Sequence, residues 1–252
     1  MSAAAPIISL KQVSKSFNKS GTAPAYIAVD RLDLQVGQGQ LLALLGKTGC
    51  GKSTIFNMIA GLSEPSSGTV TVDGRNPFRE FDAFRGKMAI VFQSDRLLPW
   101  RTAVQNVELG LEMLDMPATP RKEAAMHWLA RLGLRGHEND FPHALSGGMR
   151  QRVSIARAFA TDANILLCDE PFSALDEMTG RTLRAEFVRL VKENGKTAVF
   201  VTHSINEALE IGDRIVVLKR PASIAIDLPL TAATMPAEKQ AIRNQIQDIL
   251  AA

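Results

Sequence analysis

The sequence predicts an α/β fold with a parallel sheet at its centre. Four short apolar runs have the length of strands buried on both faces, and each is followed by polar or glycine residues that a core would reject. Ligands of open α/β sheets sit at the carboxyl ends of parallel strands, so the four endings predict one shared site. The runs comprise residues 41–45, 88–92, 165–168 and 198–201.

Two regions around this sheet have different patterns. Residues 69–72 alternate in polarity before Asp73 and Gly74, which predicts a strand and tight turn of an antiparallel β layer. Helical periodicity dominates residues 93–159 and predicts a helical insertion in the sheet. The expected elements are helices over 106–114, 121–132 and 237–250, the last with Ile242, Ile246 and Ile249 on one face, and a strand over 224–228.

The composition fits a globular domain and excludes several classes of protein. At 252 residues and 46% apolar, the chain can fill a sizeable core. Its net charge is only +3, with basic residues scattered among acids, which does not indicate a nucleic-acid groove. Cys50 and Cys168 lie far apart and support neither a disulfide framework nor a zinc site. The chain shows neither signal-peptide features nor a membrane-length segment, so we expect a soluble, cytoplasmic protein.

A phosphate-binding loop is predicted where the first strand ends. The stretch GKTGCGKST, residues 46–54, matches G-x-x-x-x-G-K-[ST], follows an apolar strand and precedes a helical run. Its glycines let successive backbone N–H groups face an anion, and the helix N-terminus adds positive charge. Lys52 can reach the β- and γ-phosphates, and Ser53 can ligate magnesium. The predicted ATP-binding residues are Gly46, Lys47, Thr48, Gly49, Cys50, Gly51, Lys52, Ser53 and Thr54.

Two adjacent acids and a histidine follow other strands. Asp169 fits the magnesium-coordinating acid of a phosphate-loop ATPase, and Glu170 can accept a proton from the attacking water. Burying two acids at a strand end is costly without a metal or other partners, which argues against an ordinary surface pair. His203 can hydrogen-bond a γ-phosphate. A structural role is the alternative for this lone histidine.

A second anion-binding signal lies at the start of a predicted helix. The stretch LSGGMRQR, residues 145–152, places Ser146 where it can cap the helix. The N–H groups of Gly147 and Gly148 can approach a phosphate closely. Spacing alone leaves a plain helix cap open as the alternative.

Together these motifs resemble, in the same order, the ATP-binding subunits of ABC transporters, and the resemblance covers nearly the entire chain. It implies a P-loop NTPase (RecA-like) α/β core with an antiparallel β subdomain and an inserted α-helical subdomain. Residues 1–252 would form one domain, with the core in 1–93 and 159–252 and the signature-bearing helical subdomain in 94–158. The motifs are the phosphate loop, Gln93, LSGG, Asp169-Glu170, the turn at 173–176 and His203.

The resemblance implies that two such subunits pair head to tail. The signature of one subunit would then close over ATP held by Lys52 of the other, and Asp176 would contribute to the dimer contact. Phe17 occupies the place of the family's adenine-stacking aromatic, although plain core packing and Tyr26 remain alternatives. The signature residues are Ser146, Gly147, Gly148 and Gln151.

The resemblance also implies the catalytic roles. Glu170 would be the general base, His203 the γ-phosphate switch, and Lys52 the phosphate-binding cation. The expected cofactors are ATP and Mg²⁺. The magnesium would be surrounded by Ser53, Gln93 and Asp169.

The compact layout, with LLPW, VQNVELGLE and DEPFSALD, is most similar to the nitrate, sulfonate and taurine importer branch. The similarity implies an ATPase on the cytoplasmic side of the inner membrane that drives uptake of a small anion. Separate permease subunits and an external solute-binding protein would be its partners. The alternatives are an exporter or lipoprotein-release ATPase and a soluble ATPase without a transport role.

An apolar cluster follows Gln93 in the stretch VFQSDRLLPW. Leu97, Leu98 and Trp100 would receive a permease helix at the start of the helical insertion, and Gln93 would connect them to ATP. Packing inside the helical subdomain is the alternative for each of the three.

Overall fold

A computed structural model describes residues 5–18, 25–173, 175–230 and 235–251. These residues form two compact units, one from Met1–Phe84 with Thr197–Ala252 and one from Arg85–Lys196, called here the first and second units. The second unit is larger than the predicted helical segment, because it also contains strands and a further helix. Residues 1–4 and Ala174 of the predicted 173–176 turn lie outside the described residues.

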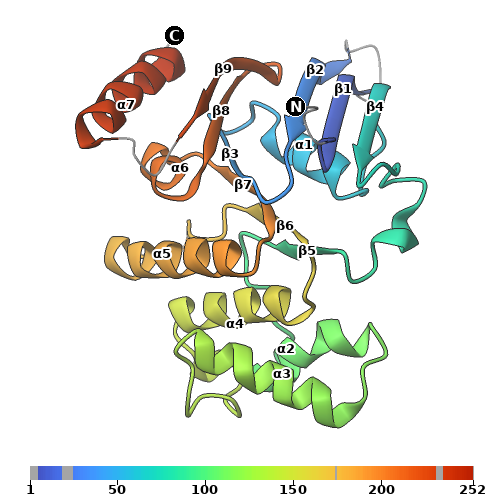
Figure 1. Cartoon of the computed structure of the whole chain (residues 1–252), viewed down its shortest axis with the longest axis vertical. Coiled ribbons are helices and arrows are strands. Elements are labelled where there is room, and N and C mark those ends of the chain that lie inside the picture. Colours follow the sequence, from blue (N-terminus) through green and yellow to red (C-terminus); the bar gives the residue numbers. More distant parts are fainter. Residues whose placement is uncertain (1–4, 19–24, 174, 231–234, 252) are drawn as a thin grey trace. The chain divides into compact units, whose positions relative to one another are not determined.

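The first unit contains a three-stranded antiparallel sheet (Figure 1). The predicted strand and turn near residue 70 belong to it, and Asp73 and Gly74 have positive φ values of 49° and 74°. Its two other strands were not predicted, and each contains a residue with positive φ, Gln12 in one and Arg31 in the other. In spatial order the strands are β2 (Tyr26–Val36), β1 (Ile8–Phe17) and β4 (Ser67–Val72).

Parallel strands in the first unit carry the phosphate loop. The strand β3 (Leu41–Gly46) is fully buried and pairs in parallel with β7 on one side and β8 on the other. Burial on both sides explains its uninterrupted apolar sequence. The remaining elements are β7 (Thr197–Thr202), β8 (Arg214–Lys219), the antiparallel β9 (Ser223–Pro229), α1 (Lys52–Ile59), α6 (Ile205–Ile211), α7 (Pro236–Ala251) and a 3-10 turn at Phe81–Phe84.

The C-terminal helix α7 has the predicted apolar face. Ile246 is completely buried in a cluster with residues of β3, β8 and α6, and Ile242 and Ile249 pack against the same cluster. The amphipathic pattern therefore predicted both the helix and its buried side.

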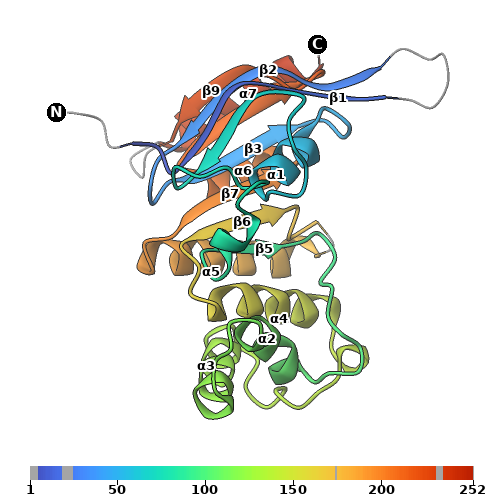
Figure 2. The same cartoon turned by 90° about the vertical axis from the view of Figure 1, so that its right-hand side faces the viewer.

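The second unit combines two parallel strands with four helices. The strand β5 (Met88–Val91) pairs with β6, and both views show α4 between α5 and the α2–α3 pair (Figures 1 and 2). The helix α2 begins earlier than its apolar periodicity suggests, because Thr102 and Gln105 form a capping box at its N-terminus. The other elements are β6 (Ile165–Asp169), α2 (Ala103–Glu112), α3 (Ala118–Arg131), a 3-10 turn at Pro142–Ala144, α4 (Gly147–Ala160) and α5 (Glu177–Glu193). None of the described helices has both the length and the apolar composition needed to cross a bilayer.

Candidate functional site

The phosphate loop leaves β3 and turns into α1, as the motif predicts. Gly49 and Gly51 have φ values of 79° and 110°, a region that side chains other than glycine rarely adopt. A Cβ atom on Gly51 would lie 2.5 Å from the carbonyl oxygen of Ala28 and 2.7 Å from the Cβ of Ala222. Two features therefore favour glycine at this position: the positive φ, and the close approach of Ala28 and Ala222.

Lys52 lies inside this loop with only 5% of its surface exposed. Its Nζ donates hydrogen bonds to the carbonyl oxygens of Gly46 at 2.7 Å and Lys47 at 3.1 Å. The N-cap of α1 is Gly51, which supplies no side-chain acceptor for the first-turn N–H groups. The loop thus combines an ammonium group with open backbone donors, while Ser53 next to Lys52 is exposed.

The two aromatic candidates for an adenine contact sit opposite each other in one antiparallel pair. Phe17 and Tyr26 are Cα partners at the ends of β1 and β2. Phe17 is 44% exposed, and the Lys15 ammonium lies 5.2 Å from its ring centre. The Tyr26 hydroxyl donates to the carbonyl oxygen of Gly49 at 3.2 Å, so Tyr26 touches the phosphate loop.

His203 is exposed at the end of β7. The preceding Thr202 is the Cα partner of Leu45 in β3, so His203 and Gly46 leave neighbouring parallel strands at the same edge. This is the edge at which α/β sheets bind ligands.

In the second unit, three predicted residues gather where β5 and β6 end. The Gln93 amide nitrogen lies 3.5 Å from Glu170 Oε2 and 3.4 Å from the Ser173 hydroxyl, which itself donates to the Glu170 carbonyl oxygen at 3.0 Å. Glu170 has a φ of 45°, uncommon for a residue with a side chain and a conformation found at functional sites. Asp169, directly before it, is half-buried as the last residue of β6. Ser173 was not predicted as a site residue, although it lies in the segment DEPFSALD.

The signature segment forms the N-terminus of α4. The Ser146 hydroxyl accepts a hydrogen bond from the N–H of Met149 at 3.3 Å and caps the helix. A Cβ on Gly148 would lie 3.0 Å from Thr179 of α5, whereas the space around Gly147 is more open. Gln151 is only 4% exposed, and its amide nitrogen has no hydrogen-bond partner among the described residues.

Asp176 caps α5, directly after the predicted turn. Its carboxylate accepts a hydrogen bond from the N–H of Thr179 at 3.0 Å, and this bond lowers the pKa of Asp176. The neighbouring Met178 is 82% exposed. A charged cap and a large apolar side chain therefore stand together on the surface of the second unit.

The cluster after Gln93 divides by exposure. Trp100 is 70% exposed, while Leu97 and Leu98 are half-buried.

Both cysteines are free and buried, and burial raises the pKa of the Cys168 thiol well above its usual range. Neither thiol is presented for reaction.

The predicted residues are divided between the units. The phosphate loop, Phe17 and His203 belong to the first unit. The second unit contains Gln93, Asp169, Glu170, Asp176, the signature residues and the Leu97–Trp100 cluster.

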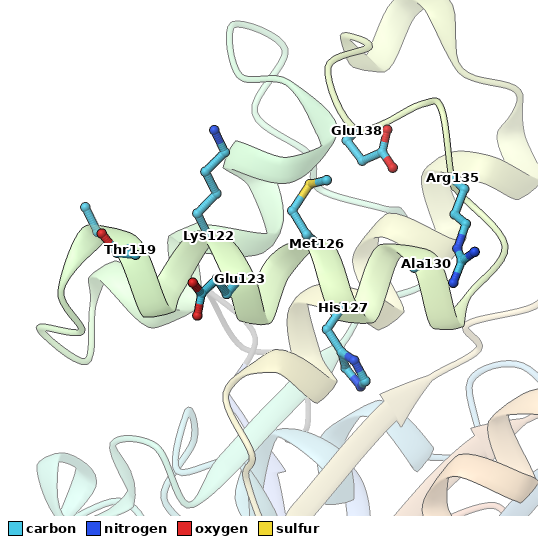
Figure 3. Close-up of a pocket in the computed structure, with 9 residues that line it drawn as sticks. Thr119, Lys122, Glu123, Met126, His127, Ala130, Arg135 and Glu138 are labelled. Atoms are coloured by element: carbon cyan, nitrogen blue, oxygen red, sulfur yellow. The ribbon is translucent and has the colours of Figure 1, made fainter.

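A separate surface hollow of about 920 Å³ runs along α3 in the second unit (Figure 3). Its lining mixes charges, with Lys122 and Arg135 near Glu123 and Glu138. None of the predicted site residues lines it.

Comparisons with known proteins agree with these motifs. The family described as ABC transporter matches residues 29–173. The taurine import ATP-binding protein TauB of Yersinia pestis bv. Antiqua (strain Antiqua) is 41% identical over 217 residues, or 86% of this chain and 84% of that protein. The nitrate import ATP-binding protein NrtC of Synechococcus elongatus is 43% identical over 195 residues, or 77% of this chain and 29% of that protein.

A solved structure also matches. The dimeric, post-hydrolysis state of the ATP-binding cassette MJ0796 bound to ADP and Pi is 35% identical, with a TM-score of 0.79 over 89% of this chain and 99% of that chain. This match confirms the predicted α/β P-loop NTPase fold. Since the family match spans more than half of the chain and relatives share 41 to 43% identity with it, the chain belongs to the ABC transporter family and is an ATPase.

Proposed function

We propose that this ATPase energises the import of a small anion, such as a sulfonate, taurine or nitrate, through separate transmembrane permease subunits. The observation that carries the proposal is the likeness to two ATP-binding proteins named for taurine and nitrate import. An external solute-binding protein would deliver the cargo, and the chain would act at the cytoplasmic face of the inner membrane. Residues that choose the cargo would then lie on those other chains.

Nucleotide binding is assigned to the loop from Gly46 to Thr54. The buried Lys52 ammonium and the uncapped N-terminus of α1 offer positive charge where the β- and γ-phosphates would lie. Phe17 is our candidate for stacking on adenine, since its ring is partly exposed at the end of β1. Tyr26, which already bonds the loop through its hydroxyl, is the second candidate.

Hydrolysis is assigned to Glu170 as general base. The Glu170 carboxylate would take the proton of the attacking water. The Gln93 amide approaches this carboxylate, and the Ser173 hydroxyl donates to the Glu170 carbonyl oxygen. His203 would hydrogen-bond the γ-phosphate and help orient the water.

Magnesium would be held by Ser53, Gln93 and Asp169. These residues offer a hydroxyl, an amide oxygen and a carboxylate, which are the oxygen donors that Mg²⁺ prefers. When bound, the ion neutralises charge on the β- and γ-phosphates.

A second copy of the chain would complete each nucleotide site. Head-to-tail pairing would place Ser146, Gly147 and Gly148 over the partner's ATP, with Asp176 at the dimer contact. Gln151 is the weakest of the signature assignments because it is buried.

The permease would dock on the helical subdomain, residues 94–158. Trp100 is the main candidate because an exposed Trp offers a large apolar area to a partner. Leu97 and Leu98 would line the same contact from partly buried positions.

Reconstituted transport tests the whole proposal. The chain is co-purified with any multi-spanning protein that a neighbouring gene encodes, placed in vesicles, and assayed for ATP-driven movement of labelled taurine, an alkanesulfonate and nitrate. Uptake of one anion supports the proposal. Movement in the opposite direction would identify an exporter. A chain that hydrolyses ATP but binds no membrane protein and moves no solute would be a soluble ATPase without a transport role.

A further inference from the structure

The segment of residues 94–101, which links Gln93 to α2, is bound to the signature helix by two arginines. Arg150 Nε donates to the carboxylate of Asp95 at 3.0 Å. Arg157 donates to two successive backbone carbonyls, that of Asp95 at 2.8 Å and that of Arg96 at 3.0 Å. Since Arg150 and Arg157 lie seven residues apart, both side chains leave the same face of α4.

The first of these arginines also bonds the signature end of α4. Arg150 Nη1 donates to the carbonyl oxygen of Leu145 at 2.7 Å, directly before the cap residue Ser146. One guanidinium therefore joins Asp95 of the linking segment to the first turn of the signature helix. The fork of donors on arginine suits it to such a double contact, which a lysine cannot reproduce.

Arg157 makes its contacts from a mostly buried position. Burial lowers the pKa of Arg157, while the nearby negative charge of Asp95 raises it. An arginine stays charged under these conditions, so its hydrogen bonds to the two carbonyls are charge-assisted.

The segment is held internally and at its far end as well. Asp95 accepts a hydrogen bond from the N–H of Leu97 at 3.2 Å, and Arg96 has a φ of 47° with its guanidinium 3.6 Å from the centre of the Phe92 ring. The completely buried Asn106 of α2 accepts from the N–H of Leu98 at 2.7 Å and donates to the carbonyl oxygens of Leu98, Arg101 and Thr102. Fixed contacts therefore bind the segment to α4 and to α2.

We propose that Arg150 and Arg157 are positioning residues that make residues 94–98 and the signature helix one mechanical element. A displacement at Gln93 then reaches Ser146 as a shift of the whole of α4, and any bending occurs at Gln93 rather than along the segment after it. The inference rests on the proposed roles of Gln93 and Ser146. The attachment itself is a property of the nucleotide-free chain.

Amide hydrogen exchange of the nucleotide-free chain tests the attachment. Arg157→Met should raise the exchange rate of amides in residues 94–98 by about tenfold or more, because both carbonyl anchors are lost. Arg157→Lys keeps the charge, so its exchange rate should lie between those of the unaltered chain and Arg157→Met. The matched control is Arg152→Met, which also removes an arginine of α4 with a backbone hydrogen bond, but one that goes to the carbonyl oxygen of Leu132 at 2.9 Å and not to the segment. Unchanged exchange in Arg157→Met, or equal loosening in Arg152→Met, would overturn the attachment.

Steady-state kinetics test the transmission. In the full chain, Arg157→Met should lower kcat by about tenfold and leave KM for ATP within about twofold. The reason is that the variant loses the attachment between residues 94–98 and α4, through which a displacement at Gln93 reaches Ser146, while the phosphate loop is unchanged. A rise in KM at constant kcat would overturn the positioning role. Absence of ATPase activity in the unaltered chain would refute the proposed function and leave the exchange result standing.

A second pair keeps the test valid if Arg157→Met does not fold. Asp95 and Arg150 have side chains 30% and 36% exposed, so their removal leaves less buried charge. Asp95→Asn and Arg150→Gln should each lower kcat, and the double variant should be no worse than either single one. Additive losses would show that the two side chains act separately and would contradict the proposal.

Discussion

The amide nitrogen of Gln93 lies 3.5 Å from the carboxylate of Glu170, although the two residues are 77 positions apart in the chain. Each follows a strand of one parallel pair, and Ser173 approaches both. A proposed magnesium ligand and a proposed general base thus share Ser173 as a neighbour. A substitution of Gln93, Glu170 or Ser173 should therefore also change the position of the other two side chains.

Glu170→Gln should keep ATP binding and abolish turnover. Loss of the base should lower kcat by about 10²-fold to 10⁴-fold, while the dimer held by unhydrolysed ATP accumulates. Phosphate release and size-exclusion chromatography with Mg-ATP measure the two effects. Glu123→Gln, on the exposed surface of α3, is the matched control and should change neither. Hydrolysis at a near-normal rate would remove Glu170 as the base.

Lys52→Ala should weaken nucleotide binding by about tenfold or more, because the loop loses the ammonium that we assign to the β- and γ-phosphates. The same change removes two hydrogen bonds to the carbonyl oxygens of Gly46 and Lys47. Calorimetric titration with ATP and with ADP measures the affinity. Lys47→Ala removes a charge from the exposed part of the loop and should cost less. Equal losses in the two variants would mean that net charge, rather than the position of Lys52, decides binding.

Gly51→Ala and Gly49→Ala separate backbone strain from steric contact. Both positions have positive φ, so alanine should lower the free energy of unfolding by about 1 kcal/mol at either one. At Gly51 the new methyl group also meets Ala28 and Ala222, whereas nothing lies within 4 Å at Gly49. Gly51→Ala should therefore cost roughly 3 kcal/mol in total, as judged by urea unfolding. Equal costs at both positions would contradict the close approach at Gly51.

Asp176→Ala should lower stability in a pH-dependent way. The folded state lowers the pKa of this carboxyl, so its contribution is present above the pKa of the unfolded chain, about 3.9, and disappears as the pH falls through the folded value. The urea midpoints of the two proteins should differ at pH 7 and converge below about pH 4.

Asp176→Asn is the control for that effect, because asparagine also caps helices but does not titrate. Its stability should stay near that of the unaltered chain at pH 7. If this variant nevertheless fails to dimerise with ATP, the carboxylate charge contributes to the dimer contact. A midpoint difference that persists unchanged at pH 3 would rule out the cap as the cause.

Trp100→Ala should weaken binding to the permease by about tenfold, as expected for an exposed aromatic anchor. Pull-down of the membrane subunit and ATP-driven uptake in vesicles give the readout, with the ATPase rate of the isolated chain measured alongside. Met113→Ala removes another side chain that is 66% exposed in the second unit and serves as the control. Full coupling in the Trp100 variant would exclude this residue from docking.

The sequence predicted those parts of the fold whose signal is local. Strands buried on both faces, such as β3 and β7, appear as uninterrupted apolar runs. The strand β8 was missed although residues 215–218 form an apolar run as long as those at 165–168 and 198–201. The strand β1 was missed because its alternation breaks at Gln12, whereas β2 was missed although residues 32–36 alternate strictly.

In the candidate site, too, the features with a local sequence pattern could be predicted, whereas contacts between residues far apart in the chain could not. The phosphate loop and the Ser146 cap are short patterns with a direct physical meaning, so they could be located from the sequence. The bond from Arg157 to Asp95 joins residues 62 positions apart, and no spacing rule relates them. The contact of Tyr26 with Gly49 joins residues 23 positions apart, and no spacing rule relates these two residues either.

The contact of Gly51 with Ala28 and Ala222 has a consequence for synthesis of the protein. Ala222 also exchanges backbone hydrogen bonds with Ala28 and Asp30, and β3 lies between β7 and β8, two strands that the ribosome produces much later. A nascent chain that ends before Ala222 therefore contains the complete nucleotide motif without the structure that shapes it. The predicted phosphate loop can therefore take its final shape only after Ala222 has been made.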